Sequence, residues 1–253
     1  MILSVDTAFQ DSVSCNGLFD GSASVLGAGG NGIYSYLWSD GQTTATASNL
    51  TAGTYNVTIT DQKGCFKDTS VTVLEPDALS VDTSFQDSVS CNGLFDGSAS
   101  ILGAGGNGIY SYLWSDGQTT STASNLTAGT YNVTITDQKG CFKDTSVTVL
   151  EPDALSVDTS FQDSVSCNGL FDGSASILGA GGNGIYSYLW SDGQTTSTAS
   201  NLTAGTYNVT ITDQKGCFKD TSVTVLEPEL VSADTTFQDS VSCNGLFDGS
   251  ASV

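Results

Sequence analysis

Residues 50–60 read Leu-Thr-Ala-Gly-Thr-Tyr-Asn-Val-Thr-Ile-Thr, and this stretch decides the fold. In its second half Tyr55, Val57 and Ile59 alternate with polar residues, as on a half-buried β-strand whose successive side chains point to opposite faces. Its first half places a leucine and a glycine turn before a tyrosine at the start of that strand. This is the layout of a tyrosine corner, in which the phenol ties a crossing between two sheets, so the stretch favours an immunoglobulin-like β-sandwich.

The flanking sequence supplies further short strands of the same sandwich. They are expected near residues 3–13, 21–26, 34–38, 43–50 and 70–73. Turn pairs such as Asn16-Gly17 and Asp40-Gly41 separate them, and no apolar stripe of helical period and length is present. Trp38 is expected to be the core aromatic of the third strand, because aromatic side chains dominate protein cores. The fold class predicted is therefore all-β.

The whole pattern recurs with a period of 76 residues. Residues 77–152 and 153–228 are identical, and residues 1–76 differ from them only at the first two positions and at Ala8, Val25 and Ala45. This period exceeds that of most solenoids, so each copy can be a small domain with its own core. The sequence predicts a tandem array of immunoglobulin-like β-sandwich repeats. The expected domains are 1–76, 77–152, 153–228 and a truncated fourth copy at 229–253, and we expect the array to continue.

Composition excludes several classes of function. The chain has a net charge of -21 and no histidine, and all six of its basic residues are lysines. Imidazole catalysis and histidine metal ligation are therefore absent, and the acidic surface repels nucleic acid and anionic lipid. No apolar run has the length of a membrane span or a signal peptide, so we expect no membrane insertion. Three copies of one catalytic site would bring little benefit, whereas a stalk or multivalent adhesin benefits directly from repetition, so no enzyme is expected.

The cysteines also repeat, with two in each complete copy, 50 positions apart. Such pairs in a small, histidine-free repeat favour disulfides in an oxidising compartment, because a zinc site would need four ligands per copy. A bond closing a loop of this size would stabilise a copy by about 4 kcal/mol. The predicted disulfide cysteines are Cys15, Cys65, Cys91, Cys141, Cys167 and Cys217.

Two pairings of these cysteines stay open. With seven alternating strands Cys15 and Cys65 would lie at opposite ends of the sandwich, too far apart to bond. With six strands they would meet, and the short connection before Thr43 leaves little room for a seventh. Pairing within a copy is therefore favoured. The rival is Cys65 with Cys91, across the turn between copies.

An ordered series of short motifs runs through every copy. In the first copy it includes Cys-Asn-Gly at 15–17, Asp-Gly-Ser at 20–22, Tyr-Ser-Tyr-Leu-Trp-Ser at 34–39, Asn-Leu-Thr-Ala-Gly-Thr-Tyr at 49–55 and Gly-Cys at 64–65. The series resembles the SprB-type repeat of very large Bacteroidota surface adhesins, including gliding-motility adhesins exported by the type 9 secretion system. The resemblance implies a filamentous, extracellular protein of the cell surface, with no catalytic residues. Asn-Gly-Ile at 31–33 departs from many relatives, which have a proline there.

We therefore expect the structural repeat region of a cell-surface adhesin, giving reach and multivalent attachment to extracellular surfaces or glycans. Neighbouring copies are expected partners of one another, because the Leu-Glu-Pro junctions contain no flexible Gly/Ser linker. Two alternative functions are also considered. The copies could be carbohydrate-binding modules that stack sugars on Tyr34, Tyr36 or Trp38, or passive spacers in a secreted multidomain enzyme.

Acidic residues in the turns raise the question of calcium, the only cofactor considered. Asp20, Asp40, Asp61 and Asp68 recur in each copy, and a cluster of carboxylates at a junction could bind Ca²⁺ and stiffen it. Solvated turn aspartates are the commoner explanation of such a pattern. No Asp-x-Asp-x-Asp loop is present.

Several tripeptides, in which an aspartate is followed by serine or threonine and then by a third residue, resemble the sites that Bacteroidota O-glycosylate. Such three-residue patterns also arise often by chance. The glycosylation candidates are Thr7, Ser12, Ser88, Ser164, Thr235 and Ser240.

Overall fold

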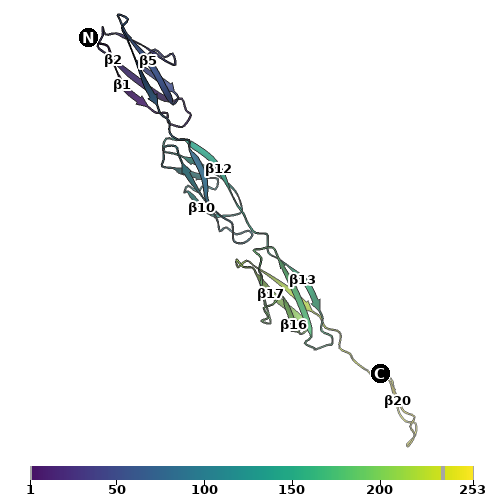
Figure 1. The fold of residues 1–253 in the computed structure, drawn as a ribbon. Coiled ribbons are helices and arrows are strands. Elements are labelled where there is room, and N and C mark those ends of the chain that lie inside the picture. Colours follow the sequence, from purple (N-terminus) through teal and green to yellow (C-terminus); the bar gives the residue numbers. More distant parts are fainter. Residues whose placement is uncertain (1, 235–236, 253) are drawn as a thin grey trace. The chain divides into compact units, whose positions relative to one another are not determined.

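The computed structural model describes residues 2–234 and 237–252 (Figure 1). The chain forms two compact units. The first unit comprises Met1–Val89 and Gly93–Glu151, and the second comprises Ser90–Asn92 and Pro152–Val253. The regular elements of the described residues are β-strands. No helix in the described ranges is long and apolar enough to cross a membrane. The all-β prediction is confirmed, with three repeated sandwich-like units.

The first copy contains six strands in two antiparallel sheets. They are β1 (Ser4–Asp11), β2 (Gly21–Ala28), β3 (Tyr34–Trp38), β4 (Thr46–Leu50), β5 (Gly53–Asp61) and β6 (Phe66–Val73). One sheet has the order β1-β2-β4 and the other the order β3-β5-β6. The predicted strands are all present, although β6 begins four residues earlier than expected because its first three residues, Phe66 to Asp68, are all exposed and show no alternation.

The other two complete copies repeat this arrangement. The second copy contains β7 (Ser80–Asp87), β8 (Gly97–Ala104), β9 (Ser111–Trp114), β10 (Thr122–Leu126), β11 (Gly129–Thr136) and β12 (Phe142–Val149). The third contains β13 (Ser156–Asp163), β14 (Gly173–Ala180), β15 (Ser187–Trp190), β16 (Thr198–Leu202), β17 (Gly205–Thr212) and β18 (Phe218–Val225). After the third copy, β19 (Phe237–Asp239) pairs with β20 (Ser250–Ser252).

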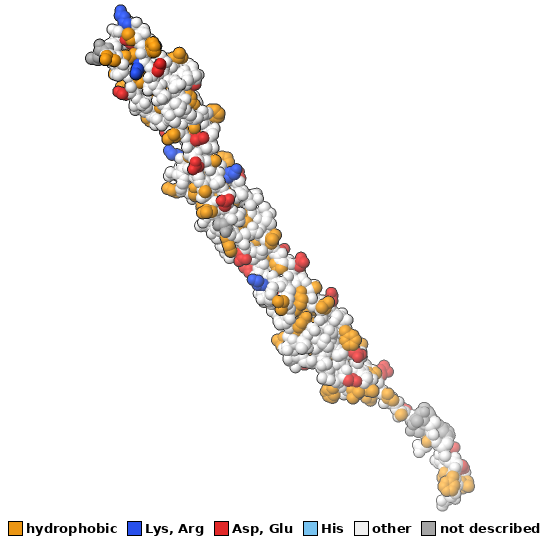
Figure 2. All heavy atoms as spheres, in the orientation of Figure 1, with side chains coloured by type: hydrophobic (Ala, Val, Ile, Leu, Met, Phe, Trp, Pro, Cys, Tyr) orange, Lys and Arg blue, Asp and Glu red, His pale blue; other side chains and the backbone are white. Residues whose placement is uncertain are grey.

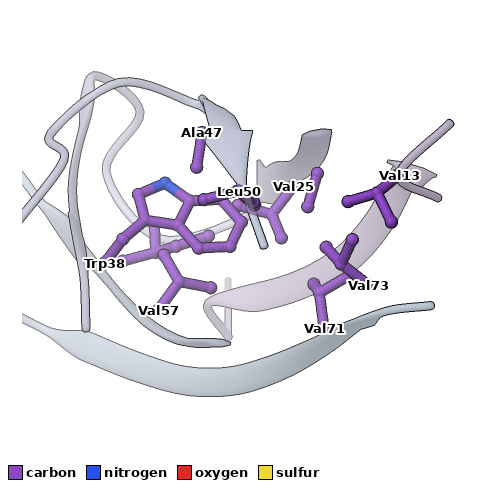
Figure 3. Close-up of a cluster of buried hydrophobic side chains, with 10 residues drawn as sticks. Val13, Val25, Trp38, Ala47, Leu50, Val57, Val71 and Val73 are labelled. Carbon is purple, nitrogen blue, oxygen red and sulfur yellow. The ribbon is translucent and has the colours of Figure 1, made fainter. Parts of the chain in front are cut away.

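Each copy has its own hydrophobic core, to which both sheets contribute. In the first copy the Trp38 side chain is only 1% exposed, and Figure 3 shows its indole among Ala47, Leu50 and Val57. The indole Nε1 donates a hydrogen bond to the Thr44 carbonyl at 2.8 Å, which satisfies its only polar group. Trp38 is thus the core aromatic that the sequence predicts.

The predicted tyrosine corner is present in every copy. The Tyr55 hydroxyl donates to the Thr51 carbonyl at 3.2 Å and lies 2.9 Å from the Thr51 hydroxyl. Tyr131 and Tyr207 make the same bonds to Thr127 and Thr203. The phenol therefore fastens the connection between β4 and β5, where the chain passes from one sheet to the other.

The connection between β2 and β3 carries a strained isoleucine. Ile33 and its equivalent Ile109 have positive φ angles, 49° and 44°. A β-branched residue rarely adopts this left-handed conformation, which costs about 1–2 kcal/mol. The strain lies in the Asn-Gly-Ile segment at 31–33, where the sequence departs from many of the SprB-type repeats that it resembles.

Replacing the strained residue should stabilise the second copy. Ile109→Asn is expected to raise its free energy of unfolding by about 1 kcal/mol, because asparagine tolerates positive φ, and little packing is lost from a side chain that is 78% exposed. Urea unfolding followed by circular dichroism measures the change. Ile109→Val keeps the β-branch and should leave stability unchanged; equal gains in both variants would contradict the strain explanation.

Candidate functional site

The two ends of each sandwich differ, and the difference decides how the copies are linked. At one end, here called the exit end, the Val13 backbone N–H donates to the Leu74 carbonyl at 3.0 Å, just before Pro76 leads into the next copy. The opposite entry end carries the β2–β3 connection and the β5–β6 turn, since Tyr34 pairs with Asp61. Cys15 follows β1 at the exit end, and Cys65 precedes β6 at the entry end.

The disulfides join each copy to its neighbour. Cys15 bonds to Cys141 within the first unit, and Cys91 bonds to Cys217 within the second. Both bonds have a Cα–Cα distance of 5.6 Å and span 126 positions of sequence. The favoured pairing within a copy, Cys15 with Cys65, is wrong, and so is the rival pairing of Cys65 with Cys91.

The direction of β4 explains why Cys15 and Cys65 do not meet. After β3, residues 39–45 run back along β2, where the Val25 N–H donates to the Ala45 carbonyl at 3.0 Å. Strand β4 then runs from the partner of Ser24 to the partner of Gly21, which is toward the exit end. Strands β3 and β4 therefore point the same way although they are consecutive. With six strands, the two cysteines of a copy therefore lie at opposite ends of the sandwich, as they would with seven alternating strands.

Three cysteines form no disulfide among the described residues. They are Cys65, Cys167 and Cys243, and all three are exposed. Cys65 and Cys167 were expected to be bonded. Cys65 lies at the entry end of the first copy and Cys167 at the exit end of the third.

A buried aspartate organises the entry end. Asp137 is 5% exposed, and its carboxylate accepts the Asn107 backbone N–H at 2.8 Å and side-chain Nδ2 at 3.0 Å. It also accepts the backbone N–H groups of Lys139 at 2.8 Å and Cys141 at 3.0 Å. Removal from water raises the pKa of Asp137, but these hydrogen bonds outweigh it and hold the pKa below its ordinary value. Asp137 thereby fixes the loop that presents Cys141.

A hydrogen bond beside the disulfide connects the first two copies. The Asn107 Nδ2 group also donates to the Ser14 carbonyl at 2.8 Å, next to Cys15. Within copy 2, the Gly106 N–H donates to the Asp77 carbonyl at 2.8 Å, which holds the first residue of the copy against its entry end. A Cβ added to Gly105 would lie 2.3 Å from the Ala78 carbonyl oxygen, so this position requires glycine. In the second unit, Asn183 makes the equivalent bond to Ser90 at 2.8 Å.

The loop that carries Cys15, residues 13–20 and here called the cysteine loop, is also held in place. The Ser14 N–H donates to the Asp20 carboxylate at 3.0 Å. The Asn16 side chain donates to the Pro76 carbonyl at 3.0 Å, and the Gly17 N–H donates to Glu75 at 2.9 Å. These bonds fasten the cysteine loop to the Leu-Glu-Pro junction, and the Ser14 side-chain hydroxyl holds the pKa of Asp20 below its ordinary value.

An open groove of about 400 Å³ lies beside the first disulfide. Its lining is mainly apolar, with Leu18, Leu79 and Phe142 next to the bonded cysteines. Figure 2 shows acidic side chains scattered over the visible face with few basic ones between them, in keeping with the net charge. The groove lining contains no acidic or basic side chain that could carry acid–base chemistry.

The four aspartates considered for calcium do not come together. Asp20 lies at the exit end and Asp61 at the entry end, where each accepts the hydrogen bonds of its own loop. Asp40 accepts the Gln42 backbone N–H at 3.2 Å, and Asp68 accepts the Thr58 hydroxyl at 2.6 Å. Across the part of the chain that the structure describes, no group of three His, Cys, Asp or Glu residues could hold a metal ion.

The remaining candidates are serine, threonine and aromatic side chains. The glycosylation candidates Thr7, Ser12, Ser88, Ser164 and Ser240 are exposed, and Thr235 lies outside the described residues; glycosylation stays a prediction. Of the aromatic residues considered for sugar stacking, Trp38 is buried, and Tyr34 and Tyr36 pack half-buried against the core. The Tyr34 hydroxyl donates to the Gly29 carbonyl at 2.7 Å. These side chains form no exposed stacking platform.

The buried aspartate at the entry end of each copy should make the free energy of unfolding depend on pH. Since Asp61, Asp137 and Asp213 have pKa values below the ordinary 3.8, their contribution is fully present above that value and is lost as pH falls through the lowered values. Urea unfolding between neutral pH and about pH 2 should show this fall. Asp137→Asn should cost the second copy about 2 kcal/mol at neutral pH and flatten its acid dependence; an unchanged acid dependence would contradict this assignment.

Comparison with known proteins identifies the repeats. The family profile described as the SprB repeat matches residues 7–43, 83–119 and 159–195. No curated protein matches the chain significantly. Among solved structures, three N-terminal domains of the bacteriophage RB49 outer capsid protein Hoc are 14% identical over 88% of this chain and 94% of that one, with a TM-score of 0.41.

Two further structures are similar at comparable levels. The immunoglobulin domains 1–5 of Sidekick-1 are 11% identical over 87% of this chain and 58% of that chain, with a TM-score of 0.35. Invasin, a bacterial integrin-binding protein, is 13% identical over 90% of this chain and 60% of that chain, with a TM-score of 0.33. The three profile matches begin at the same position of each copy and include its cysteine loop. The chain therefore carries three SprB repeats, one in each 76-residue copy.

Proposed function

We propose that the chain is the structural repeat region of a filamentous bacterial cell-surface adhesin, that it provides reach and multivalent attachment, and that it performs no catalysis. The observation that carries this proposal is the covalent bond between successive copies, Cys15 to Cys141 and Cys91 to Cys217. A binding module that acts alone gains nothing from a bond to its neighbour. A series of domains that must transmit tension does gain, because the bond prevents neighbours from separating.

The same bonds support a location outside the cytoplasm. Disulfides persist in oxidising compartments and are rare in the cytosol. The SprB repeats support a position at the cell surface, with extracellular surfaces or glycans as the partners of the whole protein. Export by the type 9 secretion system and a role in gliding motility belong to this proposal as well.

We propose further that each complete copy, 1–76, 77–152 and 153–228, is a separate domain. Each has its own core and its own pair of sheets. Residues 77–152 with Cys91→Ser and Cys141→Ser should fold alone and unfold cooperatively in urea. A non-cooperative transition would show that a copy depends on its neighbours for folding.

The function is tested in the cells that make the protein. Antibody against the repeats should label intact cells, and replacing the four bonded cysteines by serine should lower attachment under shear flow several-fold while labelling is unchanged. Leu113→Ala, at a position that is 58% exposed and outside the junctions, is the control. Absence of labelling on intact cells would refute the location, and full attachment without the disulfides would refute the tension-bearing role.

A further inference from the structure

The open groove in the first unit gives solvent access to the disulfide beside it. Both bonded cysteines, Cys15 and Cys141, line this groove of about 400 Å³ together with the apolar side chains of Leu18, Leu79 and Phe142. Leu18 is 43% exposed and Phe142 is 68% exposed, so the walls of the groove reach the surface. Exchange between a disulfide and a thiol depends on access to one of the two sulfur atoms. A small thiol can therefore reach this bond while both copies are folded.

The entry-end sulfur of each bond accepts a hydrogen bond from an asparagine. The Asn107 Nδ2 group donates to the Cys141 sulfur at 3.5 Å, and Asn183 donates to the Cys217 sulfur at 3.4 Å in the second unit. An N–H donor stabilises a thiolate more than a neutral sulfur, because hydrogen bonds to a charged acceptor are stronger. The Asp137 carboxylate, which accepts from the same Nδ2 at 3.0 Å, opposes a second negative charge, and the amide donor offsets this repulsion. The entry-end sulfur is therefore the better leaving group.

The sulfur of the cysteine loop has a weaker partner. The Cys15 sulfur lies 3.9 Å from the Ser14 hydroxyl, which also donates to the Asp20 carboxylate. A hydroxyl has a single proton to donate, and the carboxylate is the stronger acceptor of the two. A thiolate at Cys15 would therefore lack the stabilisation that the asparagine amide gives to the entry-end sulfur.

Exposure distinguishes the two sulfur atoms in the same sense. In the second unit Cys217 is only 9% exposed, whereas Cys91 is half-buried. Cys15 is half-buried as well, and the residues that follow it, Asn16 and Gly17, are exposed. An attacking thiolate therefore meets the loop cysteine at the surface, and the entry-end cysteine lies behind it.

We propose that the groove is a thiol-exchange site, in which a small-molecule thiolate attacks the Cys15 sulfur and displaces Cys141 as a thiolate held by Asn107. The attacking thiolate supplies the electron pair of the new sulfur–sulfur bond, and the pair of the broken bond stays on the Cys141 sulfur. Cys15 thus becomes a mixed disulfide with the small thiol, and Cys141 is reduced. A second thiolate that attacks the mixed disulfide completes the reduction and releases the disulfide of the small thiol.

The same exchange is expected at the second bond, where Cys91 is attacked and Cys217 leaves. Exchange at both bonds frees copy 2 to extend along its whole length under tension. Thiols of low molecular weight outside the cell would then control how far the array extends. This reactivity belongs to the bonds themselves, and it holds whether or not the filament is adhesive.

Peptide mapping after a brief exposure to thiol tests the direction of attack. The unbonded cysteines of the oxidised chain are first blocked with N-ethylmaleimide. The folded chain is treated briefly with 2-mercaptoethanol, quenched with acid and labelled at weakly acidic pH with deuterated N-ethylmaleimide. Trypsin releases each entry-end cysteine in the tetrapeptide Gly-Cys-Phe-Lys and each loop cysteine in a longer peptide, so the two positions are told apart despite the repeats. We expect 2-mercaptoethanol on the loop peptides and the deuterated label on the tetrapeptide.

Two results of this mapping would contradict the proposal. If 2-mercaptoethanol were found on the tetrapeptide as often as on the loop peptides, the direction of attack would be wrong. If the folded chain did not exchange at a thiol concentration that opens the bonds of the chain unfolded in urea, access through the groove would be wrong. Neither result depends on the folding of a variant.

Asn107→Ala separates a leaving-group role from a structural role, because the two predict opposite changes. Loss of the donor to Cys141 should slow the exchange at Cys15 by about three- to tenfold. Asn107 also donates to the Ser14 carbonyl, and a residue that merely held the junction closed would, when removed, speed the exchange. Unchanged or faster exchange at Cys15 would therefore overturn the role of Asn107.

The chain offers two controls for this variant. The bond between Cys91 and Cys217 keeps its own asparagine, Asn183, so its rate of exchange in the same sample is the internal reference and should be unchanged. Asn132→Ala, at an exposed position of β11, is the matched substitution and should leave both rates as they are. Circular dichroism checks that both variants are folded.

Discussion

Stretching the oxidised chain should lengthen it far less than stretching the reduced chain, because the disulfides bypass most of each copy. When copy 2 unfolds between its folded neighbours, Cys91 stays bonded to copy 3 and Cys141 stays bonded to copy 1. Only residues 77–91 and 141–152 then carry the load, as two parallel connections. Residues 92–140 lie outside the loaded path.

The difference in length is large enough to measure directly. The shorter of the two parallel connections, residues 141–152, limits the extension of an oxidised copy to roughly 40 Å, whereas the 76 residues of a reduced copy extend to roughly 250 Å. Single-molecule force spectroscopy should therefore show long unfolding steps only with reductant present. A variant with serine at the four bonded cysteines should show long steps without reductant. Long steps for the middle copy of the oxidised chain would contradict the pairing.

The second large effect is expected from the core tryptophan of the middle copy. Trp114→Ala should destabilise copy 2 by about 4 kcal/mol, since a fully buried indole is lost and a cavity remains. Urea unfolding followed by circular dichroism should then show a separate, early transition with about one third of the total amplitude, because each core belongs to one copy.

The adjacent residue of β9 gives the matched control for this prediction. Leu113 points away from the core and is 58% exposed, so Leu113→Ala should change stability by less than about 0.5 kcal/mol. If Trp114→Ala lowered the stability of all three copies together, the copies would not have independent cores.

Local features of the sequence were sufficient to predict the sandwich. Alternation marks the strands, the leucine, glycine and tyrosine of residues 50–55 mark the corner, and the isolated Trp38 marks the core. Each of these signals depends on residues that are neighbours in the chain. The positions of the strands and the burial of Trp38 follow from them.

The cysteine pairing could not be predicted in this way, because it depends on the path of residues 39–45. No local pattern reports that this segment returns along β2 and leaves β3 and β4 pointing the same way. The periodicity does contain a usable signal. If the two cysteines of a copy lie at opposite ends, head-to-tail repetition brings Cys15 close to Cys141. Asn107 was missed as a junction residue, and the copy-1 equivalent of Asp137, Asp61, was considered only for calcium.

The two disulfides enclose overlapping stretches of chain, from Cys15 to Cys141 and from Cys91 to Cys217. A protease that hydrolyses any one peptide bond between Cys15 and Cys217 therefore leaves both fragments attached to each other. Only a cut outside this interval, or two cuts suitably placed, releases a piece. A single proteolytic cut in this interval, which would sever an ordinary string of domains, therefore leaves the array in one piece.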